Sequence, residues 1–268
     1  MQESDDPEGP HQMRVGLRRL RSAFKAFRPM IDDKFIRDLN RASRELGLVL
    51  SELRDADVLV TEIVAAVAAE HPDNPDLAPL ITALATVQIE RRKKVRTTLR
   101  SQQRARLKLM LDELPQHLDR ISRERRNIAL NRPILRASHK ALSRLWRRVE
   151  EWGKRIDELS VPERHEMRKV LKTMRYAVDF LAPLYRSKEV NAFVKRLRKL
   201  QNIFGYLIDV AVAQKLPAIL PKELAANPEL QRAVSFVNGW HAARAESEWQ
   251  DARAAWMHLA KSRPFWLD

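Results

Sequence analysis

The chain has 268 residues, of which 50 are lysine or arginine and 35 are aspartate or glutamate, so its formal net charge is +15. Apolar residues make up 44% of it, and it contains 6 glycines and no cysteine. This composition excludes a disulfide-stapled fold and favours helices over sheets, while the apolar content suffices for a buried core. We therefore expect an all-α protein whose positive charge attracts an anionic partner.

The first ten residues, MQESDDPEGP, are acidic and lack the basic-then-apolar pattern of a signal peptide. No later stretch reaches about 18 consecutive apolar residues, the length that a membrane helix needs. We expect residues 1–10 to be a disordered N-terminus. We also expect the chain to act in the cytoplasm without a membrane partner.

A helix with two faces is predicted over residues 11–28, HQMRVGLRRLRSAFKAFR. Apolar residues from Met13 to Phe27 recur every three or four positions and form the face that packs on a core. Like charges at the same spacing repel, so an anion against the basic face would stabilise the helix; the alternative is a solvated face. The basic residues of this helix that we take as candidate binding residues are His11, Arg14, Arg18, Arg19, Arg21, Lys25 and Arg28.

The rest of the first half is predicted to form two long helices. The first runs from about residue 35 to 70 and ends before Pro72, and the second runs from about 77 to 112. Pro115 and Pro133 then bracket the link between the halves. The basic face of the second helix is either a further wall of the binding surface or a solvated outer face. The candidate binding residues on these helices are Arg41, Arg44, Lys93, Arg96 and Arg100, with Arg104 on the same face as the last three.

The second half of the sequence repeats the first. HEMRKVLKTMRYAVDFLAPLY at residues 165–185 matches the 11–28 helix at a constant offset of 154 positions, and the register continues through Asp55 and Asp209 as far as Val58 and Val212. This match predicts a duplicated unit. The candidate binding residues of the second half are His165, Arg168, Lys169, Lys172, Arg175, Tyr176, Lys195, Arg198 and Lys199.

These motifs resemble those of the CHAD family of conserved-histidine α-helical domains. The family's histidine, followed by basic residues three, seven and ten positions later, is similar to the runs that start at His11 and His165. LSELRDADV at residues 50–58 resembles the family's LGxxRDxDV block, with Ser51 in the place of the glycine. The resemblance implies two helical bundles related by a pseudo-twofold axis. It also implies a shared basic groove or pore that binds inorganic polyphosphate, or phosphate or sulfate ions in its place.

One helix of the family pattern lacks a counterpart in the first half. Residues 133–159 supply it in the second half, but the matching positions of the first half largely precede the chain. We therefore divide the chain into a first bundle, 11–132, without its opening helix, and a second bundle, 133–268. The first bundle is expected to expose an apolar strip, or to cover it with a second copy in a homodimer; a truncated sequence is the alternative explanation. The residues of this strip are Met13, Leu20 and Phe24.

The acidic residues do not predict catalysis. Asp55 and Asp57 resemble a metal-binding pair, but Asp57 aligns with Ala211, and phosphoryl transfer needs several convergent carboxylates around Mg²⁺. The sequence has no glycine-rich phosphate loop, no cysteine nucleophile and no cluster of metal-binding histidines. We expect a binding protein with no cofactor and no metal. Asp55 and Asp209 are then expected to cap a helix or pair with arginines, and Arg54 to pair with an acid.

Two other partner classes are weaker. Nonspecific binding of RNA or DNA would use the same cations, but among the basic faces Tyr176 is the main aromatic residue on which a base could stack. A scaffold for acidic proteins would need apolar anchors among the charges. Polyphosphate fits better, and association with polyphosphate granules is expected.

The two histidines predict a dependence on pH. His11 and His165 lie among basic residues, which favours their neutral forms in the free protein, whereas a bound polyanion favours protonation. Affinity for the polyanion is therefore expected to rise as the pH falls through the histidine range.

Overall fold

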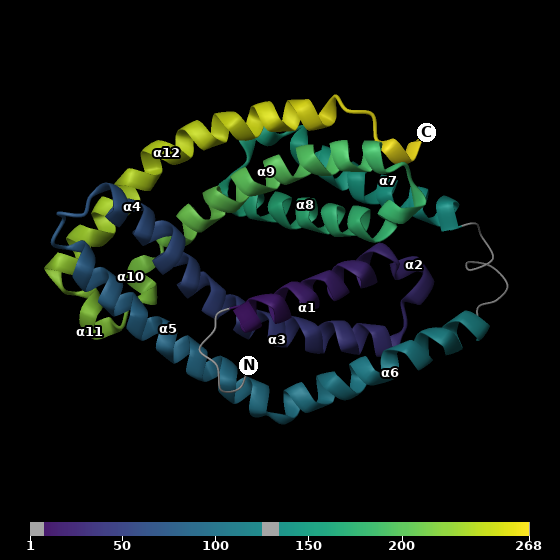
Figure 1. The fold of residues 1–268 in the computed structure, drawn as a ribbon, viewed down its shortest axis with the longest axis horizontal. Helices are drawn as coiled ribbons and strands as arrows, with labels where there is room; N and C mark the ends of the chain where they lie inside the picture. The colour runs from purple at the N-terminus through teal and green to yellow at the C-terminus, as the bar shows by residue number, and fades with distance from the viewer. Residues whose placement is uncertain (1–7, 125–133, 268) are drawn as a thin grey trace.

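The computed structural model describes residues 8–124 and 134–267, and every regular element in those ranges is helical (Figure 1). The all-α prediction is therefore confirmed. Residues 1–7 of the expected disordered N-terminus lie outside the described ranges, whereas residues 8–10 belong to the first helix. None of the helices in these ranges combines the length and the hydropathy that a membrane crossing requires.

The first half is built around one long helix. Its elements, in chain order, are α1 (Glu8–Ala26), α2 (Arg28–Ile31), α3 (Lys34–Val58), the π-helical segment η1 (Leu59–Val64), α4 (Ala65–Glu70), α5 (Leu77–Arg100) and α6 (Gln102–Glu124). α1, α5 and α6 all pack on α3. Leu17, Leu39 and Leu107 come from three of these helices and share one core.

One carboxylate fixes both the start of α3 and the position of α6. Oδ1 of Asp33 accepts a hydrogen bond from the backbone N–H of Ile36 at 3.0 Å, which satisfies a donor at the beginning of α3. Oδ2 of Asp33 lies 2.7 Å from Nε2 of His117, a buried residue of α6. The His117 ring also stacks on Phe35 of α3. Asp33 therefore joins these two helices.

The prediction of one continuous helix over residues 77–112 is wrong, because the helix is interrupted at Ser101. Ser101 has an extended backbone with a ψ of 164°, and α6 begins at the next residue. Pro115, which we expected in a link, lies inside α6. Apolar side chains of α6 are buried in the core that contains Leu17 and Leu39. The free energy gained by this burial outweighs the loss of the backbone hydrogen bond that the proline cannot donate. These side chains are Leu107, Met110, Leu111, Leu114 and Leu118.

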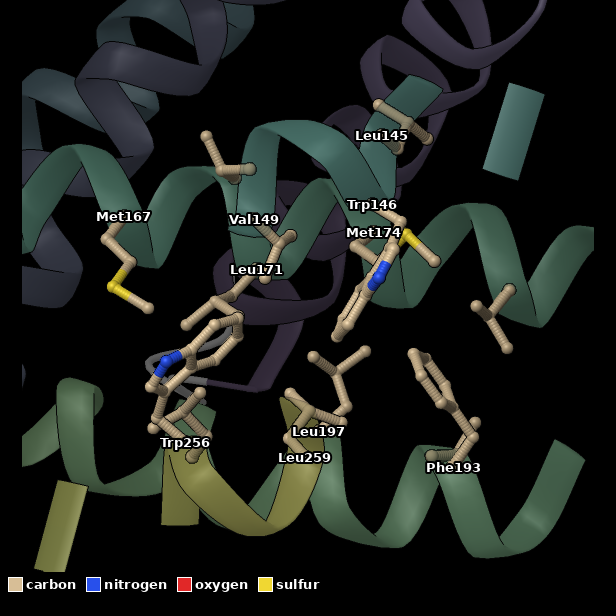
Figure 2. Close-up of a cluster of buried hydrophobic side chains, with 14 of the residues drawn as sticks. Leu145, Trp146, Val149, Met167, Leu171, Met174, Phe193, Leu197, Trp256 and Leu259 are labelled. Atoms are coloured by element: carbon tan, nitrogen blue, oxygen red, sulfur yellow. The ribbon is translucent and has the colours of Figure 1, made fainter. Parts of the chain in front are cut away.

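The second half contains the largest core. Its elements are α7 (Ile134–Gly153), η2 (Ile156–Glu158), α8 (Val161–Leu181), η3 (Ala182–Leu184), α9 (Ser187–Ala213), α10 (Leu216–Ile219), α11 (Lys222–Ala225), α12 (Pro228–Ala260) and η4 (Phe265–Leu267). α8 packs against both α7 and α9, and α12 runs along α9. Figure 2 shows how α7, α8, α9 and α12 direct their apolar side chains into this core. Trp146 contacts the rings of Phe193, Trp256 and Trp266 there.

Helix α12 joins the two halves, because it packs on α5 as well as on α9 (Figure 1). His241 of α12 is buried, and its Nε2 donates a hydrogen bond at 3.0 Å to the backbone oxygen of Ile63 in η1. Nδ1 of the same ring accepts from the Tyr206 hydroxyl at 2.9 Å. The indole N–H of Trp240 donates to the Glu70 carboxylate at 3.2 Å. These bonds attach α12 to the end of the first half.

The apolar faces of α1 and α8 are buried to different extents. Met167 and Met174 of α8 are fully buried in a core that α7 completes. Met13 and Leu20, their matched positions in α1, are only half-buried. Phe24 is buried, so the strip that we expected to be exposed is narrower than predicted and excludes Phe24. The cause is packing of α1 on α3, which covers one side of that face.

Candidate anion-binding site

Four basic side chains gather where α1 packs on α8. Burial, together with the charges of Arg18 and Arg168, lowers the pKa of Arg14 to about 10. Burial, together with the charges of Arg168, Arg18 and Arg14, lowers the pKa of Lys172 to about 6. Each helix contributes two of these residues from successive turns of one face. We call Arg14, Arg18, Arg168 and Lys172 the central cluster.

The shifted lysine changes the charge of the central cluster. A lysine side chain ordinarily has a pKa of 10.5, but Lys172 is largely uncharged at pH 7 with a pKa of about 6. Burial disfavours its charged form, and three neighbouring cations disfavour it further. An anion placed among these residues would reverse both effects and return a proton to Lys172.

Two acidic residues face the central cluster. Burial raises the pKa of Asp55 of α3 and of Asp209 of α9, while the charges of Arg14 and Arg168 respectively oppose that shift. Asp55 is nevertheless exposed to solvent, and Asp209 is half-buried. The two acids lie near arginines and offset part of the positive charge.

Arg14 and Arg168 share a feature at positions that the sequence repeat matches. The Nε atom of each guanidinium is buried and has no hydrogen-bond partner among the described residues. Leaving a buried donor without an acceptor costs about 1–3 kcal/mol, so folded proteins seldom do it. An anion between the two helices would supply the acceptors that these two groups lack.

The histidines predicted at the site flank the central cluster, and both are half-buried. Burial, followed by the charge of Arg14, lowers the pKa of His11. Burial, followed by the charges of Lys169 and Arg168, lowers the pKa of His165. Both shifts favour the neutral imidazole in the free protein, in the direction that the sequence predicts.

Hollows continue from the central cluster along α1. One of about 80 Å³ lies between α1 and α3, and Arg14, Arg18, Arg21 and Arg44 contribute to its walls. Ser43 also lines this hollow, and its buried hydroxyl has no hydrogen-bond partner among the residues described. A second hollow of about 350 Å³ shares Arg21 with the first, and it reaches two more residues of the predicted basic face. Those residues are Lys25 and Arg28.

Several other predicted binding residues already have protein partners. Arg175 forms an ion pair with Asp179 at 2.9 Å, and its guanidinium lies 4.3 Å from the ring centre of Tyr176. Tyr176 itself is only 4% exposed and belongs to the interior, so it is not an open stacking surface. Lys169 pairs with Glu166 at 2.7 Å. Arg41 pairs with Asp38 at 3.5 Å, and Arg28 pairs with Asp32 at 3.0 Å.

The predicted binding residues on α5 and α9 lie outward. Arg96 of α5 is half-buried. On α1, the guanidinium of Arg19 lies 5.8 Å from the ring centre of Phe180. The exposed members of the predicted set on these two helices are Lys93, Arg100, Lys195, Arg198 and Lys199. These five side chains lie outside the central cluster and are open to solvent.

The residues near RDADV have structural partners. Arg54 forms an ion pair with Glu62 of η1, as predicted. Asp57 is buried and accepts a hydrogen bond from Nε2 of Gln88 at 3.0 Å. Burial raises the pKa of Asp209, and the negative charge of the nearby Glu62 raises it further. Within residues 8–124 and 134–267, no group of three or more potential ligands is arranged to hold a metal.

Sequence reasoning missed three charged residues that the structure brings near the site. Glu62 could not be placed there from the sequence, because its position depends on the π-helical turn in η1. Arg144 and Arg148 of α7 line a hollow together with Lys25. Their spacing of four residues on one helix was the available signal, but the repeat gives them no counterpart within the first half.

Comparison with known proteins gives one family and similar solved structures. A sequence profile of the CHAD domain matches residues 1–217. The crystal structure of the CHAD domain from the plant Ricinus communis is similar with a TM-score of 0.79 and 28% sequence identity. That similarity covers 97% of this chain and 84% of the other. A search among curated proteins finds no match.

Proposed function

Because this chain belongs to the CHAD domain family, we propose that it binds inorganic polyphosphate at the central cluster and catalyses no reaction. The observation that carries the proposal is the pair of buried Nε atoms of Arg14 and Arg168, which lack an acceptor among the described residues. Phosphate oxygens accept hydrogen bonds from guanidinium groups in a geometry that suits both. The proposal extends to the cytoplasm as the place of binding and to polyphosphate granules as the bound material.

Binding would relieve the repulsion within the central cluster. A phosphate chain carries a negative charge at each unit, so it can approach cations of α1 and α8 at the same time. Lys172 takes up a proton as the chain binds, because the nearby negative charge raises its pKa. Asp55 and Asp209 limit the net charge when no polyanion is bound.

Nonspecific nucleic-acid binding is the alternative, because RNA and DNA also present phosphates. Proteins that hold single strands usually add aromatic surfaces on which bases stack. Tyr176 does not provide such a surface, since it is buried and the Arg175 guanidinium lies against its ring. A polymer that has phosphates and no bases therefore fits the site better.

Calorimetric titration tests the proposal, with long-chain polyphosphate and single-stranded RNA of matched charge at two salt concentrations. The variant removes the paired donors by combining Arg14→Gln with Arg168→Gln. We expect it to lose roughly 100-fold in affinity for polyphosphate, because two charge-assisted hydrogen bonds disappear. The wild-type protein should bind polyphosphate more tightly than RNA at both salt concentrations.

The matched control removes two exposed arginines, Arg106→Gln and Arg196→Gln, and therefore has the same net charge as the test variant. It should keep most of the wild-type affinity. Equal losses in both variants would indicate a general polyanion surface in place of a specific site. Equal wild-type affinity for the two polymers would favour the nucleic-acid alternative.

A further inference from the structure

A third hollow lies beyond the end of α1, where α1 and α2 meet α7. Its volume is about 530 Å³, the largest of the three hollows along this side of α1. Four cations and one acid line it together with apolar atoms of Leu145. The charged residues are Lys25, Arg28, Asp32, Arg144 and Arg148.

The acid does not neutralise the four cations. Asp32 forms ion pairs with Arg28 at 3.0 Å and with Arg37 at 3.2 Å, so its charge is already shared between two arginines. Burial and then the charge of Arg148 lower the pKa of both Lys25 and Arg144. The hollow therefore keeps an excess of positive charge that an anion would relieve.

Arg144 is held in place by the backbone. Its Nη2 donates a hydrogen bond at 2.8 Å to the carbonyl oxygen of Ala26, the last residue of α1. Arg148 lies one turn further along α7 and is exposed to solvent. One arginine of the pair is thus fixed at the wall, and the other is free to reach an anion in the hollow.

The three hollows follow one another along the basic face of α1. The hollow beside the central cluster shares Arg21 with the next one, and that one shares Lys25 and Arg28 with the hollow at α7. An α-helix rises about 1.5 Å per residue, so Arg14 and Lys25 are separated by about 16 Å along the axis. Successive positively charged residues along this distance are at most four positions apart.

We infer that a bound polyphosphate chain leaves the central cluster along α1 and crosses the hollow at α7, where Arg144 and Arg148 hold it. This inference rests on the proposed function and adds a length requirement to it. A tripolyphosphate ion is much shorter than the distance from Arg14 to the hollow, so it occupies the central cluster alone. A long chain contacts both places and gains affinity from the second one.

The experiment compares two neighbouring arginines of α7 in the full-length protein. Arg148→Glu reverses a charge in the hollow, and Arg147→Glu reverses an exposed charge that does not line it. Both variants are titrated with long-chain polyphosphate and with tripolyphosphate at fixed salt and pH. We expect Arg148→Glu to lower the affinity for the long chain about tenfold and to leave tripolyphosphate affinity within about twofold of wild type.

Three outcomes are informative. A loss confined to Arg148→Glu and to the long chain supports the path over α7. Equal effects of the two variants on the long chain, with normal tripolyphosphate binding, would overturn the path and leave the proposed function intact. Failure of the wild-type protein to bind either polyphosphate would overturn both.

Discussion

Helices α1 and α8 carry matched residues, yet their surroundings are alike on the charged side and differ on the apolar side. On the charged side Arg14 and Arg168 are alike, since each has a buried Nε without a hydrogen-bond partner among the described residues. On the apolar side they differ, because Met174 is fully buried and its match Leu20 is half-buried. The two helices therefore have similar surroundings on their charged sides. The burial of each apolar side depends instead on which other helices pack against it.

The largest test of this difference removes matched apolar side chains. Met174→Ala should reduce the free energy of unfolding by about 2–5 kcal/mol, because it leaves a cavity in a fully buried core. Leu20→Ala should cost less than half as much, because solvent already reaches part of its side chain. Urea unfolding measures both values. Equal losses would show that α1 is covered as completely as α8, for example by a second copy of the chain.

A glycine in each half gives the next test. A Cβ atom built on Gly153 of α7 would lie 2.0 Å from an atom of the Trp256 ring, so Gly153→Ala should destabilise the protein by about 1–3 kcal/mol. Gly16 of α1 has no neighbour within 4 Å of its Cβ position, so Gly16→Ala should stabilise by about 0.5–1 kcal/mol. Thermal unfolding of the two variants should therefore shift in opposite directions. A shift of the same sign would contradict the difference in packing between α7 and α1.

A smaller effect concerns the one position of the central cluster where the helices carry different cations, Arg18 and Lys172. The pKa of Lys172 is about 6 in the folded protein and 10.5 ordinarily, so the unfolded chain binds a proton that the folded chain lacks between these values. Stability should therefore rise with pH across that window. Lys172→Met should remove the rise and add about 1–3 kcal/mol at pH 7, well below the full shift because solvent reaches the site. Arg18→Met should keep part of this rise, because it removes only one of the cations that lower the pKa of Lys172.

The same groups should make binding depend on pH. A bound polyphosphate raises the pKa values of Lys172, His11 and His165, so its affinity should increase about tenfold as the pH falls from about 8 to 6. Calorimetry in two buffers of different ionisation enthalpy would measure the protons taken up. A dissociation constant that does not change over this range would exclude all three groups from the linkage.

The sequence predicts the helical spacing of the central cluster, but it misplaces one chain break in the first half. The spacing of Arg14, Arg18 and their matches in α8 follows from helical periodicity, and it survives in the structure because both faces meet at one contact. Pro115 misled the prediction, because local propensity favours a break there while tertiary burial of α6 decides otherwise. The true break at Ser101 carries no proline or glycine that would mark it.

The parts of the site that sequence could not predict depend on non-local packing. Tyr176 falls next to a basic face on a helical wheel, but packing buries it and Arg175 covers its ring. Arg144 and Arg148 belong to a helix outside the repeated motifs, and only the approach of α7 to the end of α1 brings them to the hollow. Unusual local geometry also matters, because the charge of Glu62, which lies in a π-helical turn, acts on the pKa of Asp209.

The order in which the polypeptide leaves the ribosome gives Trp266 a particular importance. It is fully buried among Trp146 and Phe193, and its indole N–H donates to the Ser143 hydroxyl at 3.1 Å. The hydrophobic interior shared by α7, α8 and α9 therefore stays open on one side until translation has passed residue 266. A nascent chain that already carries every arginine of the central cluster would still expose aromatic surface at this stage, and exposed surface of this kind promotes aggregation.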